Sequence, residues 1–322
     1  MSLDDLDVVF LAWREEPGML ARHHAAVAAA LPADWRGSAV LVENAAPKIT
    51  SHAARALLAS SYPAARRVVL RLPANYGFGR AMNLALGECE GTYAALVNSD
   101  GWPDPGMFEH LVAALEAHPE AVWAAPSVHG LDEPRHAAGP PAPVDELSGT
   151  AIVIRRQAFL DSGGFDPLFF FYHEDFDASR RLRAAGATLL RVPRARFHHG
   201  RDGRSRRGRL RREFWYAVGD QLMLGVHQPS RAVAARRLAR SRPRSLSQHA
   251  RSADWPAAAG IAAATLALPL TSLLAERRRR RPWTSAELAS WLDAHRPRAS
   301  RVEIASSPPP LVSDHRITAE HA

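Results

Sequence analysis

Residues 163–180 read GGFDPLFFFYHEDFDASR, and this segment guides the interpretation of the whole chain. Four acidic residues adjoin an aromatic run here: Asp166, Glu174, Asp175 and Asp177. A carboxylate against aromatic rings loses hydration, which raises its pKa and makes it a better proton acceptor near neutral pH. We therefore treat Glu174 and Asp175 as candidate catalytic residues. The residues alone leave open an alternative, a turn followed by a helix whose N-terminus attracts the acids.

The composition allows one large α/β domain and a smaller appendage, because 322 residues can bury a substantial core. The formal net charge is +8, and Lys48 is the only lysine. Arginines concentrate between residues 191 and 281, whereas the first 190 residues are nearly balanced. We therefore expect an anionic partner to meet the C-terminal third, with phosphates and anionic lipid as candidates. Nucleic acid is the least favoured partner, since the arginines lie outside the acidic motifs.

Two further features concern the compartment. The single cysteine, Cys89, excludes an intrachain disulfide and a cysteine-based zinc site, and it fits a reducing compartment. The N-terminal sequence MSLDDLDVVFLAW lacks the basic start of a signal peptide. We therefore expect the catalytic part to be cytoplasmic.

Short apolar runs predict parallel strands buried on both faces, at 8–12, 38–42, 67–72 and 92–97. A helix is expected at 18–31, which makes the start of the chain a nucleotide-binding α/β pattern. Ligands of open parallel sheets bind beyond the carboxyl ends of the strands. Trp13 and Arg14 follow the first strand, and Glu43 and Asn44 follow the second, so these residues should face a ligand.

The loop at 75–80, NYGFGR, precedes a helix expected to continue to about residue 86. Gly77 lets the backbone approach a ligand closely, and the helix N-terminus offers N–H groups to a diphosphate. Arg80 can add a bidentate phosphate contact. A tight turn with a helix cap is the alternative reading of this loop.

The strand at 92–97 ends in Asn98-Ser99-Asp100. A carboxylate at such a strand end, near a diphosphate loop, suits Mg²⁺ or Mn²⁺; the alternative is a turn aspartate that caps its own loop. His198 and His199, after a last strand at 188–192, can be metal ligands, phosphate contacts or surface residues. Gly149 opens a strand at 147–155, where a missing side chain leaves room for a bulky ligand.

In this order the motifs resemble those of the family 2 glycosyltransferases, particularly bacterial rhamnosyltransferase-like members, over about residues 7–205. The matching motifs are NYGFGRAMN at 75–83, NSD at 98–100, Gly149 with Arg155, the whole of 163–180, and the two histidines. The resemblance implies an α/β GT-A fold, with a Rossmann-like and mostly parallel sheet, that binds a nucleoside-diphosphate sugar.

The resemblance also implies roles for individual residues. Asp175, ahead of Glu174, would take the proton from an acceptor hydroxyl in an inverting displacement. Asp100 would bridge Mn²⁺ or Mg²⁺ to the diphosphate, and His199 matches the family histidine better than His198 does. The metal would stabilise the leaving nucleotide as a Lewis acid. Glu43 would lie near the nucleobase, and the remaining donor contacts would come from Asn44, Asn75, Gly77, Arg80, Asn83, Asn98 and Gly149.

The chain departs from the family pattern at two strand ends. Ala12-Trp13-Arg14 stands where the family usually has a Thr/Asn-Tyr-Asn tip. The stretch VENAAP at 42–47 keeps an acid and the asparagine but lacks the usual serine and second aspartate. The nucleotide therefore stays open among dTDP, UDP and GDP. A non-catalytic sugar-nucleotide or glycan-binding relative is the alternative function.

The predicted domains are a GT-A domain at 1–205, a helical, arginine-rich extension at 206–300 and a disordered tail at 301–322. Within the extension, residues 255–275 are uncharged and apolar, with Pro269 inside and five arginines directly after. A membrane span would fit the length but would set those arginines against the positive-inside tendency. We expect an in-plane or re-entrant helix against anionic lipid, with a helix packed on the domain as the alternative. The expected acceptor is a glycan or lipid-linked glycan at the inner face of the cell membrane.

Overall fold

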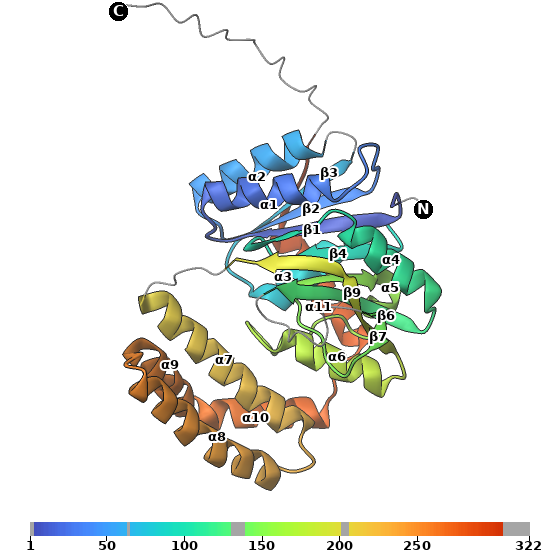
Figure 1. Ribbon diagram of the computed structural model, residues 1–322. Helices are drawn as coiled ribbons and strands as arrows, with labels where there is room; N and C mark the ends of the chain where they lie inside the picture. The colour runs from blue at the N-terminus through green and yellow to red at the C-terminus, as the bar shows by residue number, and fades with distance from the viewer. Residues whose placement is uncertain (1–2, 63–64, 130–138, 201–205, 305–322) are drawn as a thin grey trace, which may run out of the picture.

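The computed structural model describes residues 3–62, 65–129, 139–200 and 206–304. Its strands are β1 (Leu6–Ala12), β2 (Ser38–Asn44), β3 (Arg66–Leu72), β4 (Tyr93–Val97), β5 (Gly101–Pro103), β6 (Ala121–His129), β7 (Ala142–Pro143), β8 (Ala151–Arg155), β9 (Thr188–His199) and β10 (Ser300–Glu303). They join into one sheet in the order β10-β3-β2-β1-β4-β8-β6-β9-β5, and β7 pairs with β9. This sheet forms the centre of the upper part of the molecule in Figure 1.

The first half of the sheet is parallel and buried on both faces. Strands β3, β2, β1 and β4 pair in parallel, as their uninterrupted apolar runs predict. The helices α1 (Pro17–Ala29), α2 (Lys48–Ser61) and α4 (Met107–Ala117) pack on one face. The other face is covered by α3 (Phe78–Leu86), α5 (Arg156–Asp161), α6 (Glu174–Ala184) and α11 (Ser285–His295).

The second half of the sheet is mixed. Strand β8 runs antiparallel to both of its neighbours, β4 and β6, and β5 runs antiparallel to β9. The strand expected at 188–192 continues to His199, because β9 pairs with β6 along its length and then with β5. His198 and His199 therefore lie within a strand and not in a loop beyond it. Because side chains alternate along a strand, the two histidines face opposite sides of the sheet.

Asp7 joins three chain segments at the start of the parallel strands. Its carboxylate is buried and accepts hydrogen bonds from the backbone N–H groups of Ser38, Glu90 and Gly91 at 2.6–2.8 Å. These bonds tie the beginning of β2 and the turn before β4 to β1. The parallel core is thereby fixed at the end of the sheet opposite to the strand tips that form the cavity described below.

A helical bundle follows the sheet domain, made of α7 (Arg206–His227), α8 (Arg231–Arg251), α9 (Trp255–Leu266) and α10 (Leu268–Arg280). In Figure 1, α7 lies between the sheet domain and helices α8 and α9. Glycines allow this packing: a Cβ on Gly260 of α9 would lie 2.3 Å from the carbonyl oxygen of Leu210, and one on Gly225 of α7 would lie 2.5 Å from the Cβ of Ala275. The bundle is thus held by close contact between small residues.

The apolar segment expected at 255–275 forms two helices instead of one. No single helix among the described residues is long and apolar enough to cross a membrane. Helices α9 and α10 meet that requirement only as a pair, and they are bent by 60° at the break between them.

The chain then returns to the sheet domain. Helix α11 buries Leu288 and Leu292 in the core beneath α3, and β10 pairs antiparallel with β3. The helical extension therefore ends near residue 280, and residues 301–303 belong to an edge strand where we expected the tail to begin. The rest of that tail, from residue 305, lies outside the described residues.

Two adjacent histidines of α1 are buried below the tip of β1. The ring of His24 lies 4.6 Å from that of Phe10 and accepts or donates a 3.3 Å hydrogen bond with the Tyr62 hydroxyl. Burial, with help from the neighbouring His23, lowers the pKa of His24 to about 3. Both imidazoles are therefore neutral in the folded protein at pH 7, because burial also lowers the pKa of His23, to about 4.

This burial predicts destabilisation by acid. The unfolded chain takes up a proton at His24 near pH 6.5 and the folded chain only near pH 3, so stability falls as the pH drops through that interval. For one such histidine the loss between pH 7 and pH 5 is about 2 kcal/mol. Urea unfolding at both pH values should show that His24→Phe removes a loss of this size, whereas the exposed His52→Gln does not. Equal acid sensitivity in all three proteins would refute the assignment.

Candidate active site

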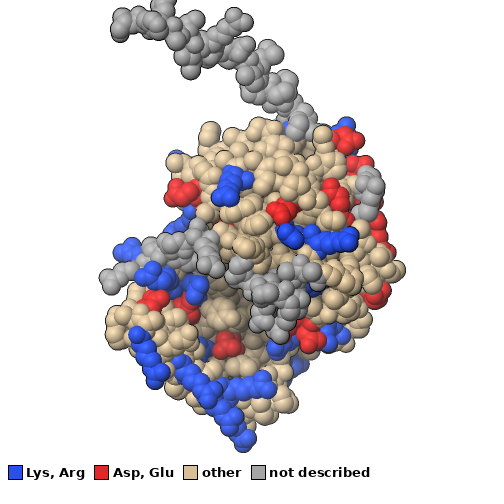
Figure 2. Space-filling model, viewed as in Figure 1, with Lys and Arg blue, Asp and Glu red and all other residues tan. Residues whose placement is uncertain are grey.

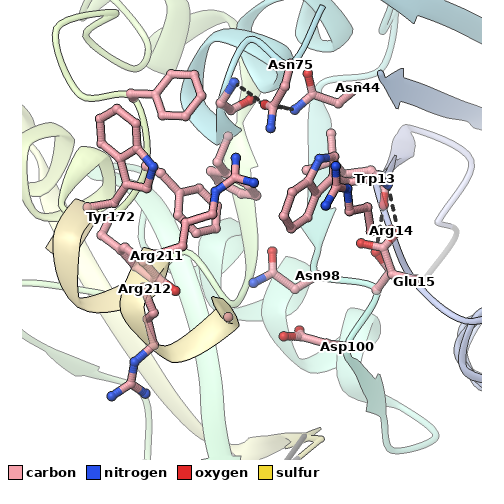
Figure 3. A pocket seen from close by; sticks show the side chains of 18 of the residues that line it. Trp13, Arg14, Glu15, Asn44, Asn75, Asn98, Asp100, Tyr172, Arg211 and Arg212 are labelled. Carbon is pink, nitrogen blue, oxygen red and sulfur yellow. Dashed lines mark hydrogen bonds between the residues drawn. The ribbon is translucent and has the colours of Figure 1, made fainter. Parts of the chain in front are cut away.

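A cavity of about 590 Å³ opens at the carboxyl ends of the parallel strands (Figure 3). Its walls come from three places: the strand tips after β1, β2 and β4, the loop before α3 with the aromatic run at 170–172, and the first half of α7. Seven of the residues predicted from the sequence to face a ligand line it: Trp13, Arg14, Asn44, Asn75, Gly77, Asn98 and Asp100. Residues at the ends of β1, β2 and β4 therefore come together at one cavity, and their contact with a ligand stays a prediction.

Asn44 organises the loop before α3. Its side-chain amide donates to the Gly77 carbonyl and to the Asn75 side chain, at 3.0 and 3.1 Å, and its oxygen accepts from the Tyr76 N–H at 2.7 Å. The Asn75 side chain in turn accepts from the Gly77 N–H at 2.8 Å. The two asparagines thus fix the loop that forms one wall of the cavity.

Gly77 brings this loop against the aromatic run. It has a left-handed backbone, with φ of 81°, and a Cβ there would lie 1.9 Å from the Phe170 carbonyl oxygen. Arg80 donates to the Pro167 carbonyl at 2.9 Å, and Asn83 both donates to and accepts from the backbone of Phe165. The structure thus uses Arg80 and Asn83, which we expected in donor binding, to hold segment 163–180 against α3.

Glu43 is removed from the cavity wall. Its carboxylate is buried between Arg55 of α2 and Arg71 of β3, at 2.5 and 3.1 Å, because Glu43 lies within β2 and pairs in register with Arg71 on the neighbouring strand. Glu43 therefore does not reach the cavity where we expected it to contact a nucleobase. Its neighbour Asn44 lines the cavity instead.

The tip after β4 carries the candidate metal ligands. Ser99 bonds to the Leu11 carbonyl at 2.6 Å and so fastens this tip to β1. The Asp100 carboxylate lies 3.5 Å from His199 Nε2. His198 faces away, where it pairs with Asp104 at 2.7 Å and stacks on Trp102. Of the two histidines, His199 is the one beside Asp100.

Glu15 adds a second carboxylate to this wall. It accepts a 2.7 Å hydrogen bond from the Trp13 N–H, and its pKa is raised, mainly by burial and further by the nearby Asp100. No group of three or more histidine, cysteine or acidic residues among the described residues is arranged to hold a metal ion. Asp100 and His199 supply two ligands of the kinds that Mn²⁺ accepts, and substrate phosphates can supply others.

Glu174 and Asp175, at the start of α6, differ in burial and in hydrogen bonding. Glu174 is buried against Gly79, and one of its oxygens has no hydrogen-bond partner among the described residues. Burial, and then the charge of Asp175, raises its pKa well above the usual value, which favours the protonated form of this carboxyl group.

Asp175 is only half-buried. Its two oxygens accept from the N–H groups of Gly149 and Phe176, both at 2.8 Å, and Gly149 therefore orients the carboxylate. Burial raises its pKa against these two hydrogen bonds. Burial raises the pKa of Tyr216 of α7, and the charges of Asp220 and then Asp175 raise it further. Asp175 does not line the cavity itself; it lies beside Phe78, which does.

The two remaining acids of segment 163–180, Asp166 and Asp177, anchor this segment to the bundle. Asp177 is buried and accepts from Arg181 and His227 at 2.8 Å, and its pKa is lowered because the charge of Arg181 and these two hydrogen bonds outweigh the effect of burial. Asp166 pairs with Arg278 of α10 at 2.7 Å. Burial raises the pKa of Asp166 to about 6 despite this partner.

Sequence reasoning did not anticipate a stacked group of side chains at the cavity. The guanidinium of Arg211 lies 4.8 Å from the centre of the Trp13 ring, and that of Arg14 lies 5.2 Å from it. In Figure 3, Arg211 extends from α7 toward Trp13, whereas Arg212 pairs with Glu213. Trp215 stacks on Phe170 at 4.5 Å. The departures at residues 13 and 14 were the available signal, but nothing in the sequence paired them with α7.

Two family models match the chain. The model described as glycosyl transferase family 2 matches residues 16–175, and the one described as glycosyl transferase family group 2 matches residues 129–291, just over half of the chain. These two matches together include every residue of the cavity wall beyond Glu15.

Two curated proteins are similar over parts of the chain. An N-acetylglucosaminyl-diphospho-decaprenol L-rhamnosyltransferase of Mycobacterium tuberculosis is 46% identical over 66 residues, 19% of this chain and 22% of that protein. The amylovoran biosynthesis glycosyltransferase AmsE of Erwinia amylovora is 23% identical over 138 residues, 39% of this chain and 51% of that protein. The matches thus span from about a fifth to half of the relatives' lengths.

Solved structures share the fold. The mannosyltransferase PcManGT from Pyrobaculum calidifontis, in complex with GDP-Man and Mn²⁺, superposes with a TM-score of 0.54 and 16% identity, covering 91% of this chain and 86% of its own. GalNAc-T7 with UDP, GalNAc and Mn²⁺ gives a TM-score of 0.53 and 17% identity, covering 67% and 50%. At such identities the likeness concerns the fold alone, which is the GT-A fold. With the family models, it leads to one conclusion: the chain belongs to the family 2 glycosyltransferases.

Proposed function

We propose that the chain transfers a sugar from a nucleoside-diphosphate donor to a hydroxyl group of a glycan or lipid-linked glycan, with inversion at the anomeric carbon. The observation that carries the proposal is the cavity, which brings the acidic tip at Asp100 and the aromatic residues that precede Asp175 to one space. Its volume of about 590 Å³ lies within the range of small-molecule sites.

For the donor, we propose that Asp100 and His199 hold Mn²⁺ or Mg²⁺, which would neutralise charge on the departing diphosphate when bound. The Mn²⁺ in the complexes of PcManGT and GalNAc-T7 supports this proposal for related folds. Arg211 and Arg14 add positive charge at the same cavity, and Asn44, Asn75 and Asn98 offer neutral hydrogen bonds. The choice among UDP, GDP and dTDP is left to binding measurements.

For the acceptor, we propose that Asp175 removes the proton from the attacking hydroxyl. The Gly149 N–H holds one oxygen of Asp175 in place, and its raised pKa favours proton uptake. Tyr172 and Tyr216, whose rings lie 5.7 Å apart, form an aromatic surface beside it on which a sugar ring can pack. Glu174 is less suited to this role because its side chain is buried and no backbone N–H orients its free oxygen among the described residues.

The proposed class of acceptor is based on the names of the two curated relatives. The name of the Mycobacterium tuberculosis protein describes transfer of rhamnose to a diphosphate-linked polyprenol sugar, and that of AmsE describes polysaccharide synthesis. We propose an acceptor of this general kind, used at the cytoplasmic face of the membrane. The second candidate function, sugar-nucleotide binding without turnover, is favoured only by the burial of Glu43 away from the cavity.

The metal assignment predicts metal-dependent nucleotide binding that requires Asp100. Calorimetric titration of UDP, dTDP and GDP, with and without Mn²⁺, should find one nucleotide whose affinity rises with the metal. Asp100→Ala should lower that affinity at least about tenfold, because the bridge between protein and diphosphate is lost. His198→Ala is the matched control and should bind normally, since His198 faces Asp104. Nucleotide binding that is the same with and without metal would contradict the assignment.

The two adjacent carboxylates provide a matched test of the base. Asp175→Asn should lower sugar transfer by about 10²–10⁴-fold while leaving the donor dissociation constant nearly unchanged. Glu174→Gln should keep most of the activity, because the amide keeps the size and shape of a side chain that is buried.

Transfer rates and donor affinity are measured on both variants. Loss of activity in Glu174→Gln with retention in Asp175→Asn would reverse the assignment. Donor binding by the wild-type protein without turnover on any diphosphate-linked or free glycan would favour the binding function.

A further inference from the structure

The helical bundle carries most of the positive charge of the protein. Residues 206–281 contain 17 arginines and four acidic residues, a net charge of +13, whereas the whole chain carries +8. Each of the four acids is ion-paired with an arginine: Glu213, Asp220, Asp254 and Glu276. Many of the arginines are exposed, among them Arg236, Arg240, Arg277 and Arg281. Figure 2 shows the basic side chains gathered over the bundle.

The same bundle exposes large apolar side chains around the bend between α9 and α10. Leu266, at the end of α9, is 85% exposed, and Leu270 and Leu273 of α10 are 59% and 48% exposed. Leu270 and Leu273 are three residues apart and therefore share one helix face. Trp255, at the start of α9, is 62% exposed. No charged residue occurs from 255 to 275, so this surface lacks the charged side chains that solvent-facing helices usually carry.

Packing within the protein does not explain these side chains. Helix α9 meets α7 through its opposite face, which buries Ala257, Gly260, Ile261 and Ala264. The helix is thus apolar on both sides, but only the side made of small residues is used inside the bundle. The exposed leucines and Trp255 form a second apolar surface, which is flanked in the sequence by Arg251 on one side and by the arginines at 277–281 on the other.

We propose that this surface, Trp255 with Leu266, Leu270 and Leu273, docks on an anionic lipid bilayer. The apolar side chains enter the boundary between headgroups and acyl chains, and the flanking arginines bind headgroup phosphates. Docking would bring the cavity to a lipid-anchored acceptor, and in this respect the inference rests on the proposed function. Helix α7 connects the two, because it carries Arg211 and Trp215 at the cavity and packs on α9.

Charge and chemistry favour a bilayer over other occupants. A second copy of the bundle would bring +13 against +13, which opposes self-association through this face. A nucleic acid would use the arginines but gives exposed leucines no apolar partner. The 60° bend and the arginines at both ends favour a position in the interface over a straight span.

The test uses the purified full-length chain and sedimentation with vesicles of phosphatidylcholine alone or with 30% phosphatidylglycerol. We expect binding to the anionic vesicles, release by alkaline carbonate, and little binding to the neutral ones. The double variant Leu266→Gln with Leu270→Gln should weaken binding roughly tenfold through lost apolar burial. Arg277→Gln with Arg281→Gln should weaken it about 25-fold, at about fivefold per arginine.

Matched controls lie on the sheet domain. Ile49→Gln removes an apolar side chain that is 67% exposed on α2, and Arg36→Gln removes an exposed arginine. Both should bind vesicles like the wild type. Transfer to a water-soluble acceptor should be unchanged in the leucine and arginine variants, which separates failure of docking from failure of the proposed reaction.

Three outcomes would overturn the proposal. The first is no binding to anionic vesicles. The second is binding that the leucine variant does not change, especially if RNA competes for it, because a general polyanion surface would then suffice. The third is resistance to carbonate, which would indicate an embedded segment instead of a docking surface.

Discussion

The contact between Gly77 and the Phe170 carbonyl is the constraint on which the cavity depends. It brings the loop that follows β3 against a segment that lies about ninety residues later in the sequence. Asn83 and Arg80 extend the contact through the backbone of Phe165 and Pro167. Because these partners are backbone groups, the contacts constrain the path of the chain and do not depend on which side chains occupy positions 165–170. Only glycine at position 77 permits this approach, since any Cβ would overlap the carbonyl.

The acidic segment has a second set of supports on its other side. Asp166 and Asp177 reach Arg278 and His227 of the bundle, and Trp283 donates to the Gly163 carbonyl at 2.6 Å. The segment that presents Asp175 is therefore held between α3 and the C-terminal helices. The bundle thus contributes to positioning the candidate base as well as to lining the cavity.

The sequence predicted the parts of the molecule that local pattern determines. Buried parallel strands produce continuous apolar runs, so β1 to β4 and the residues at their tips could be located. Asp100 and Asn44 lie at the cavity for this reason. The choice of Asp175 over Glu174 came from resemblance, and the surroundings of the two residues agree with it, although their roles stay predictions until variants are measured.

What could not be predicted depends on contacts between distant segments. An apolar run of five residues looks the same in a parallel or antiparallel strand, so the reversal at β8 left no sign. Glu43 is buried because Arg55 and Arg71, on other elements, surround it. Arg80 and Asn83 have side chains that suit phosphates, but their distance to Pro167 and Phe165 decides what they bind. The same holds for Trp13 and Arg211, which are almost two hundred residues apart.

The pairing of β10 with β3 has a consequence for the synthesis of this protein. Residues 300–303 complete the edge of a sheet whose other strands end at residue 199, so about a hundred residues must leave the ribosome between the last central strand and the closing one. During that interval the backbone of β3 is an open edge, able to pair with other chains. Arg66 and Arg71, at the two ends of β3, place charge along this edge and oppose such pairing while the bundle forms.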